Sequence, residues 1–334
     1  MRAMLIRQTG PAGVFEEAAL PRPEAQAGQV LVRVRASSVN PIDIKIRAGI
    51  VPLAGELPAV LHGDMAGEVV AVGGGVTGFK EGDAVYGLIG GAAGNPGALA
   101  EYVAVDARLI AVKPRSLTFA EAAALPVAAL TALEAVCQRA PQPMGAQVLV
   151  HAGTGGVGHI AVQLARSAGM RVAATVSSAD KGTIARRLGA DEVINYREET
   201  VADYVTRLTQ GRGFDLVIDT VGGDNLARSF AAARLGGNVV CTAARGTHDL
   251  SLMHSRGLSL HVVFKLLPLL TGQHRARIGE DLATLAALAD AGKFRPLLDE
   301  KVFAMNRVAL AHERLESGLA LGKVVLEGWV EVGL

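Results

Sequence analysis

A glycine-rich turn carries the most specific chemistry in this sequence. Residues 151–158 read HAGTGGVG, and Gly153, Gly155 and Gly158 match the pattern G-x-G-x-x-G. In such a turn the first glycine permits a tight bend, the second lets the backbone approach a pyrophosphate, and the third lets a helix pack closely on a strand. Backbone N–H groups and the helix dipole then hold the phosphates of a dinucleotide. The predicted binding residues of the turn are Gly153, Thr154, Gly155, Gly156, Val157 and Gly158.

The residues after the next apolar segment indicate which dinucleotide is bound. Units that bind NAD place an acidic residue about 20 positions beyond the glycines, where it bonds the ribose hydroxyls. Here the segment RVAATV leads into Ser177 and Ser178, and Lys181 follows. Two hydroxyls and an ammonium favour a 2′-phosphate, which a carboxylate would repel, so we expect NADPH. Tyr196 follows the next predicted strand and is expected near the same pocket. Asp180 is interpreted as the N-cap of a helix that begins near Lys181.

Strands and helices alternate around this turn, which is typical of a doubly wound parallel sheet. Buried apolar runs predict strands, and apolar residues at helical spacing predict helices. The expected strands are 147–151, 171–176, 214–219 and 238–242, and the expected helices are 157–168 and 181–189. The fold class is therefore α/β.

The first hundred residues have a different character. Short β-branched runs such as 29–36 (QVLVRVRA) and 67–72 (GEVVAV) alternate with glycine turns. This pattern predicts a compact β-rich unit. The length of 334 residues fits about two domains. A helix is expected at 278–291 and a closing strand at 322–326.

The composition excludes several classes of protein. Half of the residues are hydrophobic and 19% are charged, so the chain is not disordered. The net charge is +1 and the aromatic fraction is 4%, so neither nucleic acid nor an anionic membrane surface is expected as a partner. The most apolar windows, 122–136 and 258–270, lack the ~20 uninterrupted apolar residues of a membrane span. Two cysteines and no secretory signal indicate a cytoplasmic protein.

Several further segments resemble one family. They are Asn40-Pro41-Ile42-Asp43 with Arg47 and Gly49, HGDMAGEVVAVGGGVTGFKEGDAVYG (62–87), GALAEYVAV (97–105), INYREE (194–199) and GKVVLEG (322–328). Together with the glycine turn, they resemble the medium-chain dehydrogenase/reductase superfamily, in its zinc-free branch of quinone oxidoreductases and zeta-crystallin-like proteins. The resemblance covers nearly the whole chain.

The resemblance implies a domain organisation and an activity. A GroES-like, β-rich catalytic domain would comprise residues 1–118 and 266–334, and a Rossmann dinucleotide-binding domain would comprise residues 119–265. The implied activity is hydride transfer from NADPH to a small-molecule substrate. The implied assembly is a homodimer joined through the Rossmann sheets.

The resemblance also implies roles for individual residues. In relatives, the residues that match Ser177, Lys181 and Tyr196 hold the 2′-phosphate, and those that match Asn40 and Thr131 line the nicotinamide pocket. Lys323, in the terminal GKVVLEG segment, is also assigned to cofactor binding.

The zinc site of other family members has no counterpart in the sequence. Zinc-dependent relatives carry a cysteine at the position that matches Asn40. Asp64 alone cannot supply the three protein ligands of a catalytic zinc. His62 is one position out of register, so that on a strand it would point to the opposite face. We therefore expect no metal.

Reduction of an activated double bond is the chemistry that needs least from such a site. The negative charge moves to an oxygen that hydrogen-bond donors or water can stabilise, whereas alcohol oxidation without a Lewis acid is hard. The candidate donors are Asn40, Lys45 and Tyr86. Some quinone reductases of the family have tyrosine where this chain has Lys45, which leaves the quinone preference open, and a surface role for Lys45 is at least as well supported. Asp43 is either a turn or cap residue or part of the site.

The favoured hypothesis is thus an NADPH-dependent reductase of quinones or α,β-unsaturated carbonyls. One alternative is a reductase of enoyl thioesters. Another is an NADPH-binding protein with little catalysis, because some zeta-crystallin relatives serve as structural proteins of the lens.

Overall fold

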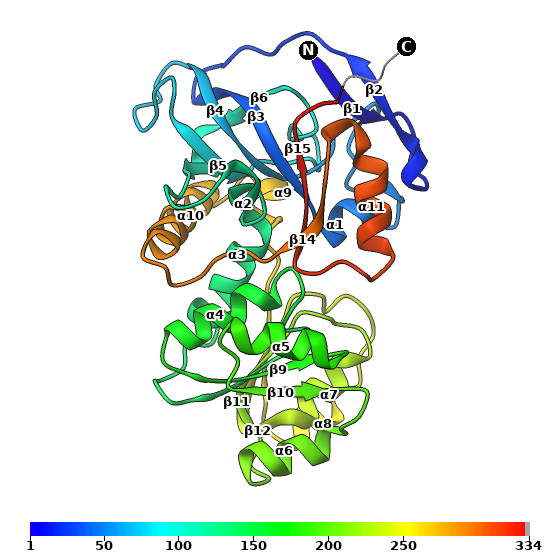
Figure 1. The fold of residues 1–334 in the computed structure, drawn as a ribbon, viewed down its shortest axis with the longest axis vertical. Helices are drawn as coiled ribbons and strands as arrows, with labels where there is room; N and C mark the ends of the chain where they lie inside the picture. The colour runs from blue at the N-terminus through cyan, green and yellow to red at the C-terminus, as the bar shows by residue number, and fades with distance from the viewer. Residues whose placement is uncertain (331–334) are drawn as a thin grey trace. The chain divides into compact units, whose positions relative to one another are not determined.

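The computed structural model describes residues 1–330, and the chain divides into two compact units. The first unit comprises Met1–Leu130, Leu266–Gly292 and the chain from Pro296 onward, and the second comprises Thr131–Lys265 and Lys293–Arg295. In Figure 1 the first unit is coloured blue to cyan and again orange to red, and the second is mainly green to yellow. Residues 119–130, which we expected in the second domain, lie in the first unit, where helix α2 (Phe119–Ala123) packs on strands β3 (Gln29–Val39) and β4 (Asp64–Val72).

The second unit is built on a six-stranded sheet in the order β10-β9-β8-β11-β12-β13, and every pair of neighbours is parallel. Almost every residue of the central strands is buried, because apolar runs without alternation suit strands that are covered on both faces. The strands are β8 (Gln147–Val150), β9 (Arg171–Val176), β10 (Glu192–Asn195), β11 (Phe214–Asp219), β12 (Ala233–Cys241) and β13 (Ser259–Val262). The helices are α4 (Gly158–Ser167), α5 (Ala179–Arg187), α6 (Val201–Thr209), α7 (Asn225–Ala232) and α8 (Ser251–Ser255).

The strand order of this sheet reverses at β8. The chain runs from β8 to β9 and β10 on one side, and then crosses to β11, β12 and β13 on the other. Ligands of doubly wound sheets bind at the carboxyl ends of the strands beside such a reversal. Because β8 leads directly into the glycine turn, the fold places that turn at the expected binding point.

The first unit contains a seven-stranded sheet whose longest strand, β3, organises the site. The sheet order is β14-β15-β3-β4-β5-β7, and β6 also pairs with β3. The register pairs Val39 of β3 with Val324 of β15 and Ser37 with Met65 of β4. Antiparallel pairing therefore brings the ends of three distant segments together at the carboxyl end of β3. The other strands are β1 (Arg2–Ile6) and β2 (Phe15–Ala19), which pair with each other, and β5 (Ala84–Leu88), β6 (Tyr102–Asp106), β7 (Ile110–Val112), β14 (Leu298–Phe303) and β15 (Lys323–Glu327).

Short helices cover this sheet. Helix α1 (Pro41–Arg47) starts directly after β3, and the Asp43 carboxylate accepts a hydrogen bond from Asn40 N (2.8 Å). Asp43 is therefore a helix-capping residue, one of its two expected roles. Helix α10 (Arg275–Asp290) packs on β5 and β7, and α11 (Val308–Glu316) packs on β15 and α1. The remaining helices are α3 (Pro126–Leu133), followed by a π-helical turn at Glu134–Gln138, and α9 (Leu267–Thr271).

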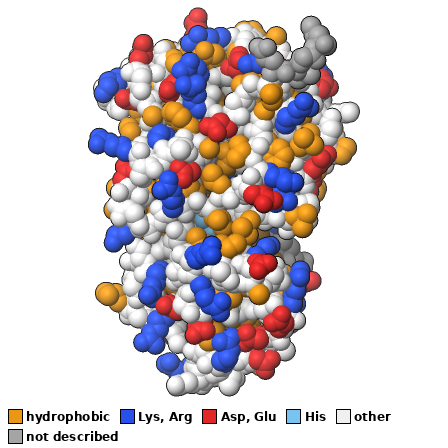
Figure 2. Space-filling model, in the orientation of Figure 1, with side chains coloured by type: hydrophobic (Ala, Val, Ile, Leu, Met, Phe, Trp, Pro, Cys, Tyr) orange, Lys and Arg blue, Asp and Glu red, His pale blue; other side chains and the backbone are white. Residues whose placement is uncertain are grey.

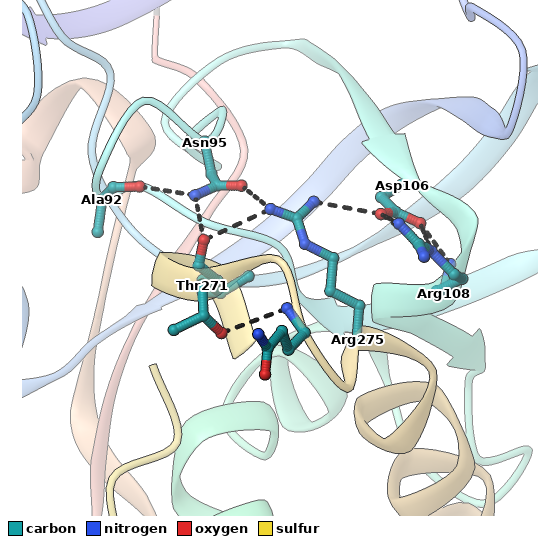
Figure 3. Close-up of polar contacts among 8 residues, drawn as sticks. Ala92, Asn95, Asp106, Arg108, Thr271 and Arg275 are labelled. Carbon is teal, nitrogen blue, oxygen red and sulfur yellow. Dashed lines mark hydrogen bonds and ion pairs between the residues drawn. The ribbon is translucent and has the colours of Figure 1, made fainter. Parts of the chain in front are cut away.

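One arginine anchors the segment that returns to the first unit. Figure 3 shows the Arg275 guanidinium between Asn95 and Asp106, at 2.9 Å from Asn95 Oδ1 and 3.2 Å from Asp106 Oδ2. The Asn95 amide in turn donates to Leu269 O (3.2 Å). These bonds tie α9 and α10 to loops formed almost two hundred residues earlier, so the two parts fold as one unit.

Charged side chains of both signs lie on the surface (Figure 2). On the face shown in Figure 2, Lys and Arg side chains are interspersed with Asp and Glu side chains, in keeping with the net charge of +1. Across residues 1–330, the structure contains no helix with the length and apolar character needed to cross a bilayer.

Candidate cofactor site and active site

The glycine turn is pressed between β9 and the start of α4. Gly153 N donates to Thr175 O of β9 (3.0 Å), and Ala152 has a left-handed φ of 51°. A Cβ atom on Gly158 would lie 2.1 Å from Ala152 O, and one on Gly153 would lie 2.6 Å from Ala174 Cβ. Neither position can carry a side chain without moving backbone, which is the role predicted for the first and third glycines.

The N-terminus of α4 has the properties of an anion site. Its N-cap residue, Val157, makes no side-chain hydrogen bond to the first turn. His159 N and Ile160 N already donate to Gly155 O (3.1 Å) and Val157 O (3.1 Å). Within residues 1–330, the N–H groups of Gly156, Val157 and Gly158 have no acceptor, so they keep their hydrogen-bonding capacity at the positive end of the helix dipole. Together with the glycine turn, this arrangement fits the pyrophosphate of a dinucleotide.

Four further predicted residues gather at the tip of β9. Ser177 and Ser178 directly follow the strand, Lys181 lies in the first turn of α5, and Tyr196 N donates to Val176 O (3.2 Å). In residues 1–330, neither the Lys181 ammonium nor the Tyr196 hydroxyl has a side-chain or backbone partner. The tip thus offers free donors, and its first acidic residue is Asp180.

The prediction that Asp180 caps α5 was wrong. Ser178 is the N-cap, because its Oγ accepts a hydrogen bond from Lys181 N (3.3 Å). Asp180 lies instead inside the first turn, where a negative charge interacts favourably with the helix dipole. Serine and aspartate are both good N-cap residues, so the residue types alone did not show that the helix begins at Ala179, two residues before the expected start at Lys181.

A buried carboxylate at the tip of β11, Asp219, was not among the residues predicted from the sequence. Asp219 is fully buried and accepts hydrogen bonds from Val221 N (2.9 Å), Gly222 N (2.8 Å) and Ser229 Oγ (2.7 Å). The adjacent Thr220 hydroxyl donates to His151 O (2.8 Å), at the start of the glycine turn. Asp219 therefore shapes the loop that lies beside the turn. The only sequence signal was an acidic residue followed by Thr-Val-Gly-Gly at the end of a predicted strand.

In the first unit, Asn40 belongs to a buried polar cluster at the carboxyl end of β3. Its Nδ2 donates to Asp64 Oδ2 (2.8 Å), and its Oδ1 accepts from Lys323 Nζ (2.5 Å). Lys323 Nζ also contacts Asp64 Oδ2 (3.2 Å) and donates to Val39 O (3.3 Å). The Asp64 carboxylate further accepts from Ser38 Oγ (2.7 Å) and Val127 N (2.8 Å).

This cluster fixes the orientation of the Asn40 amide. The amide oxygen faces the Lys323 ammonium and the amide nitrogen faces the Asp64 carboxylate. A flip of the side chain would place the amide N–H groups beside the ammonium and the amide oxygen beside the carboxylate, and both contacts would be repulsive. An amide nitrogen has two N–H groups, and Asp64 uses one of them. Asn40 thus retains one N–H donor in a defined direction.

The other predicted residues occupy different environments. The Tyr86 hydroxyl donates to Leu282 O (2.6 Å), and the side chain is fully buried, which raises its pKa above the ordinary value. Tyr86 is therefore a structural residue, and its prediction as a catalytic donor was wrong. Lys323 has three acceptors inside its own cluster, which leaves no N–H for a phosphate. Lys45 is exposed on α1, and Thr131 is buried in α3.

Comparison with known proteins identifies the family. A model described as "Alcohol dehydrogenase GroES-like domain" matches residues 26–115, and one described as "Zinc-binding dehydrogenase" matches residues 188–326. The chain is 37% identical over 311 residues to a 2-methylene-furan-3-one reductase from Solanum lycopersicum, covering 91% of this chain and 73% of the relative. An alcohol dehydrogenase superfamily protein from Novosphingobium aromaticivorans shares 40% identity and a TM-score of 0.93, with 99% and 100% of the two chains covered. An Escherichia coli quinone oxidoreductase in complex with NADPH shares 27% identity and a TM-score of 0.87, with 98% and 100% covered.

The chain belongs to the quinone oxidoreductase branch of the medium-chain dehydrogenase/reductase superfamily. This finding confirms the resemblance, the Rossmann and GroES-like fold class and the assignment as an oxidoreductase enzyme. Its cofactor is a nicotinamide dinucleotide, and the open end of α4 fits that group.

Zinc, which the description of one family model names, does not fit the residues of this family member. In residues 1–330, no three His, Cys, Asp or Glu side chains lie close enough together to hold a metal ion. At the Asn40 position the neighbouring carboxylate, Asp64, is already bonded to the Lys323 ammonium. Cys137 and Cys241 both lie in the other unit. We therefore derive no chemistry through a metal.

Proposed function

We propose that the protein uses NADPH to reduce the activated double bond of an α,β-unsaturated carbonyl compound or a quinone, without a metal. The observation that carries the cofactor preference is the tip of β9. Ser177, Lys181 and Tyr196 offer two hydroxyls and an ammonium there, and the strand ends without a carboxylate. A 2′-phosphate dianion is stabilised by such donors, and an acidic residue that selects a ribose hydroxyl is missing from the strand end.

The glycine turn would hold the pyrophosphate of the cofactor. The N–H groups at the start of α4 would bind its oxygens, and Gly153 and Gly158 keep that helix close enough to the turn to do so. The Asp219 carboxylate would act only by holding the neighbouring loop, because its hydrogen bonds go to the protein.

When bound, the nicotinamide supplies the hydride. The role of Asn40 would be to donate its remaining amide N–H to the oxygen that gains negative charge during the reduction. The Lys323 and Asp64 charges cancel each other, so the cluster presents a dipole rather than a net charge. Such a donor stabilises an enolate oxygen without first having to lose or gain a proton. Lys45, which is exposed, or water would supply the proton that completes the reduction.

The relatives agree with this chemistry in kind. The tomato relative is named a 2-methylene-furan-3-one reductase, and the E. coli neighbour is a quinone oxidoreductase solved with NADPH. Both substrates named there carry a carbonyl conjugated to a carbon–carbon double bond.

The test is a substrate panel read out as NADPH consumption. The panel contains quinones, enones, saturated aldehydes and an enoyl thioester, each with NADPH and with NADH. We expect turnover of enones or quinones, with NADPH strongly preferred. Preferential reduction of the enoyl thioester would establish the first alternative reading, and tight NADPH binding without turnover of any substrate would establish the second.

We further propose a homodimer formed through the second unit. Strand β13 lies at the edge of the parallel sheet. Its last residue, Val262, and Phe264, two positions after the strand, are about half exposed (47% and 46%). An uncovered apolar sheet edge favours pairing with another strand. Light scattering should give the mass of a dimer for the wild type and of a monomer for Val262→Asp. A monomeric wild type would disprove this assembly.

A further inference from the structure

Two fully buried histidines lie behind the Asn40 cluster, and the reaction described above does not use them. His62 precedes β4, and His312 lies on α11. Their Nε2 atoms are 2.8 Å apart, so one nitrogen must donate and the other must accept. Both side chains have no exposed surface.

The His312 end of the pair has a fixed direction. His312 Nδ1 lies 3.5 Å from Arg47 Nη1, and the same guanidinium binds Glu316 at 2.7 and 3.2 Å. Arginine can only donate, so His312 Nδ1 carries a lone pair. A neutral His312 then has its proton on Nε2 and donates it toward His62.

The contacts of His62 give the same direction for the hydrogen bond between the two histidines. The Ser37 hydroxyl donates its only proton to Asp64 O (2.8 Å) and lies 3.2 Å from His62 Nδ1. Ser37 can therefore only accept from His62, which places the His62 proton on Nδ1 and leaves a lone pair on Nε2. Both ends thus require that His312 donates to His62.

We infer that Arg47, His312, His62 and Ser37 form a one-directional hydrogen-bond chain that positions Asp64, and through it the Asn40 amide. Each member donates to the next, and the chain ends on the backbone carbonyl of Asp64, whose side chain binds Asn40. His62, His312 and Ser37 are thus positioning residues, because none of them touches Asn40 itself.

The chain has no place for an additional proton. A second proton on His62 would sit on its Nε2 atom, where it would face the Nε2–H group of His312. A proton on His312 Nδ1 would instead face the N–H groups of the Arg47 guanidinium. The surrounding charges are Arg47 on α1, Glu316 on α11, Lys323 on β15 and Asp64 on β4, and Glu316 is already paired with Arg47. Burial, the neighbouring imidazole and Lys323 lower the pKa of His62, while burial and Arg47 lower that of His312 to about 3.

The first experiment reads the tautomers directly and does not depend on any substrate. The full-length protein contains eight histidines, and all of them are labelled with ¹⁵N. The variants His62→Asn and His312→Gln show which signals belong to His62 and His312, because each variant removes the signals of one ring. We expect the Nε2–H tautomer for His312, the less common Nδ1–H tautomer for His62, a scalar coupling between their Nε2 atoms, and no titration of either from pH 8 to 5. The Nε2–H tautomer at His62, or titration of either ring near pH 6.5, would overturn the inference.

The second experiment tests the positioning role and rests on the proposed function. His312→Leu keeps the volume but removes the donor, and Ser37→Ala breaks the last link with the loss of one oxygen. Each should lower kcat on the order of tenfold, since small displacements of reacting groups cost one to two powers of ten. The dissociation constant of NADPH should stay within about twofold, because the glycine turn lies in the other unit.

Two further variants distinguish positioning from general stability. His312→Gln retains an N–H near the Nε2 position and should recover most of kcat, whereas the exposed His254→Leu is the matched control and should have no effect. Unchanged kcat in folded Ser37→Ala and His312→Leu would refute the positioning role. If His312→Leu does not fold, Ser37→Ala and His312→Gln decide the question. If the wild type reduces no member of the substrate panel, the proposed function fails while the tautomer result still stands.

Discussion

Replacement of Gly158 by alanine tests how the glycine turn holds the cofactor. The added Cβ would lie 2.1 Å from Ala152 O and 2.9 Å from Ala152 C, and both atoms are backbone. Ordinary contact begins at 3.4 Å, so the turn and the start of α4 must separate by about 1.3 Å. A shift of that size moves the helix N–H groups away from the pyrophosphate, and we expect NADPH affinity to fall by about 10²-fold. Overpacking should also cost about 1–3 kcal/mol of unfolding free energy.

The comparison with Gly155→Ala separates the two effects. A Cβ on Gly155 would lie 3.2 Å from Ala152 O, a contact that the turn relieves with a shift of a few tenths of an ångström. Because this glycine lets the backbone approach the pyrophosphate, Gly155→Ala should weaken NADPH binding with little change in melting temperature. Gly13→Ala, whose Cβ meets nothing within 4 Å, is the control. Calorimetric titration with NADPH and thermal unfolding measure both quantities. Wild-type affinity and melting temperature in Gly158→Ala would refute the packing described for the turn.

Three further predictions follow from other parts of the structure. Lys181→Met should raise the dissociation constant of NADPH on the order of tenfold and leave that of NADH unchanged, because the ammonium meets only the 2′-phosphate; equal losses for both cofactors would contradict this role. Dialysis against a chelator should leave the activity unchanged, and a loss that zinc restores would show that a metal is needed. The unfolding free energy should fall as the pH drops below about 6.5. Burial lowers the pKa values of His62, His151 and His312, to about 4 for His151 and about 3 for His312. These histidines therefore take up protons more readily in the unfolded chain, and protonation favours that chain. Each histidine contributes at most about 1.4 kcal/mol per pH unit in that range. Burial raises the pKa of Asp43 to about 7, so this carboxyl takes up a proton more readily in the folded protein and the folded state gains stability as the pH falls. This gain offsets the loss from one histidine but not the loss from three. Chemical denaturation at pH 7.5 and 5 measures the change, and equal stability at the two values would contradict it.

The Rossmann part of the fold could be predicted because its signals are local. Residues 171–176 and 214–219 are strands with the expected bounds, since uninterrupted apolar runs suit a sheet that is covered on both faces. Helix α4 lies within one residue of the expected 157–168, because the glycine turn fixes where it starts. Strand β12 begins earlier than the expected 238–242, at Ala233, in a stretch that contains Gly236 and Gly237. Glycines often mark the end of a strand, but here Gly236 and Gly237 lie inside β12. The strand is irregular in this stretch, because its register with β11 shifts.

The site in the first unit could be predicted only in part. Asn40 was assigned from a resemblance, but its side-chain partners come from β4 and β15, and α3 donates to the β4 partner, Asp64; none of these contacts is local in sequence. Tyr86 was assigned wrongly because a tyrosine near the expected site looks like a donor until its hydroxyl partner, Leu282 O, is known. Pairings between segments that are hundreds of residues apart are set by sheet register, which sequence periodicity does not encode.

The ion pair beside Asn40 is explained better by orientation than by stability. Burying Lys323 and Asp64 removes two charges from water, and apolar side chains of similar volume often stabilise a protein equally well or better. Apolar neighbours, however, would leave the two ends of the Asn40 amide equivalent. A cation at Oδ1 and an anion at Nδ2 make one orientation strongly favoured, because a flip would reverse both interactions. The buried pair therefore gives the Asn40 amide a donor of known direction, and the hydrogen-bond chain from Arg47 holds the carboxylate end of that pair in place.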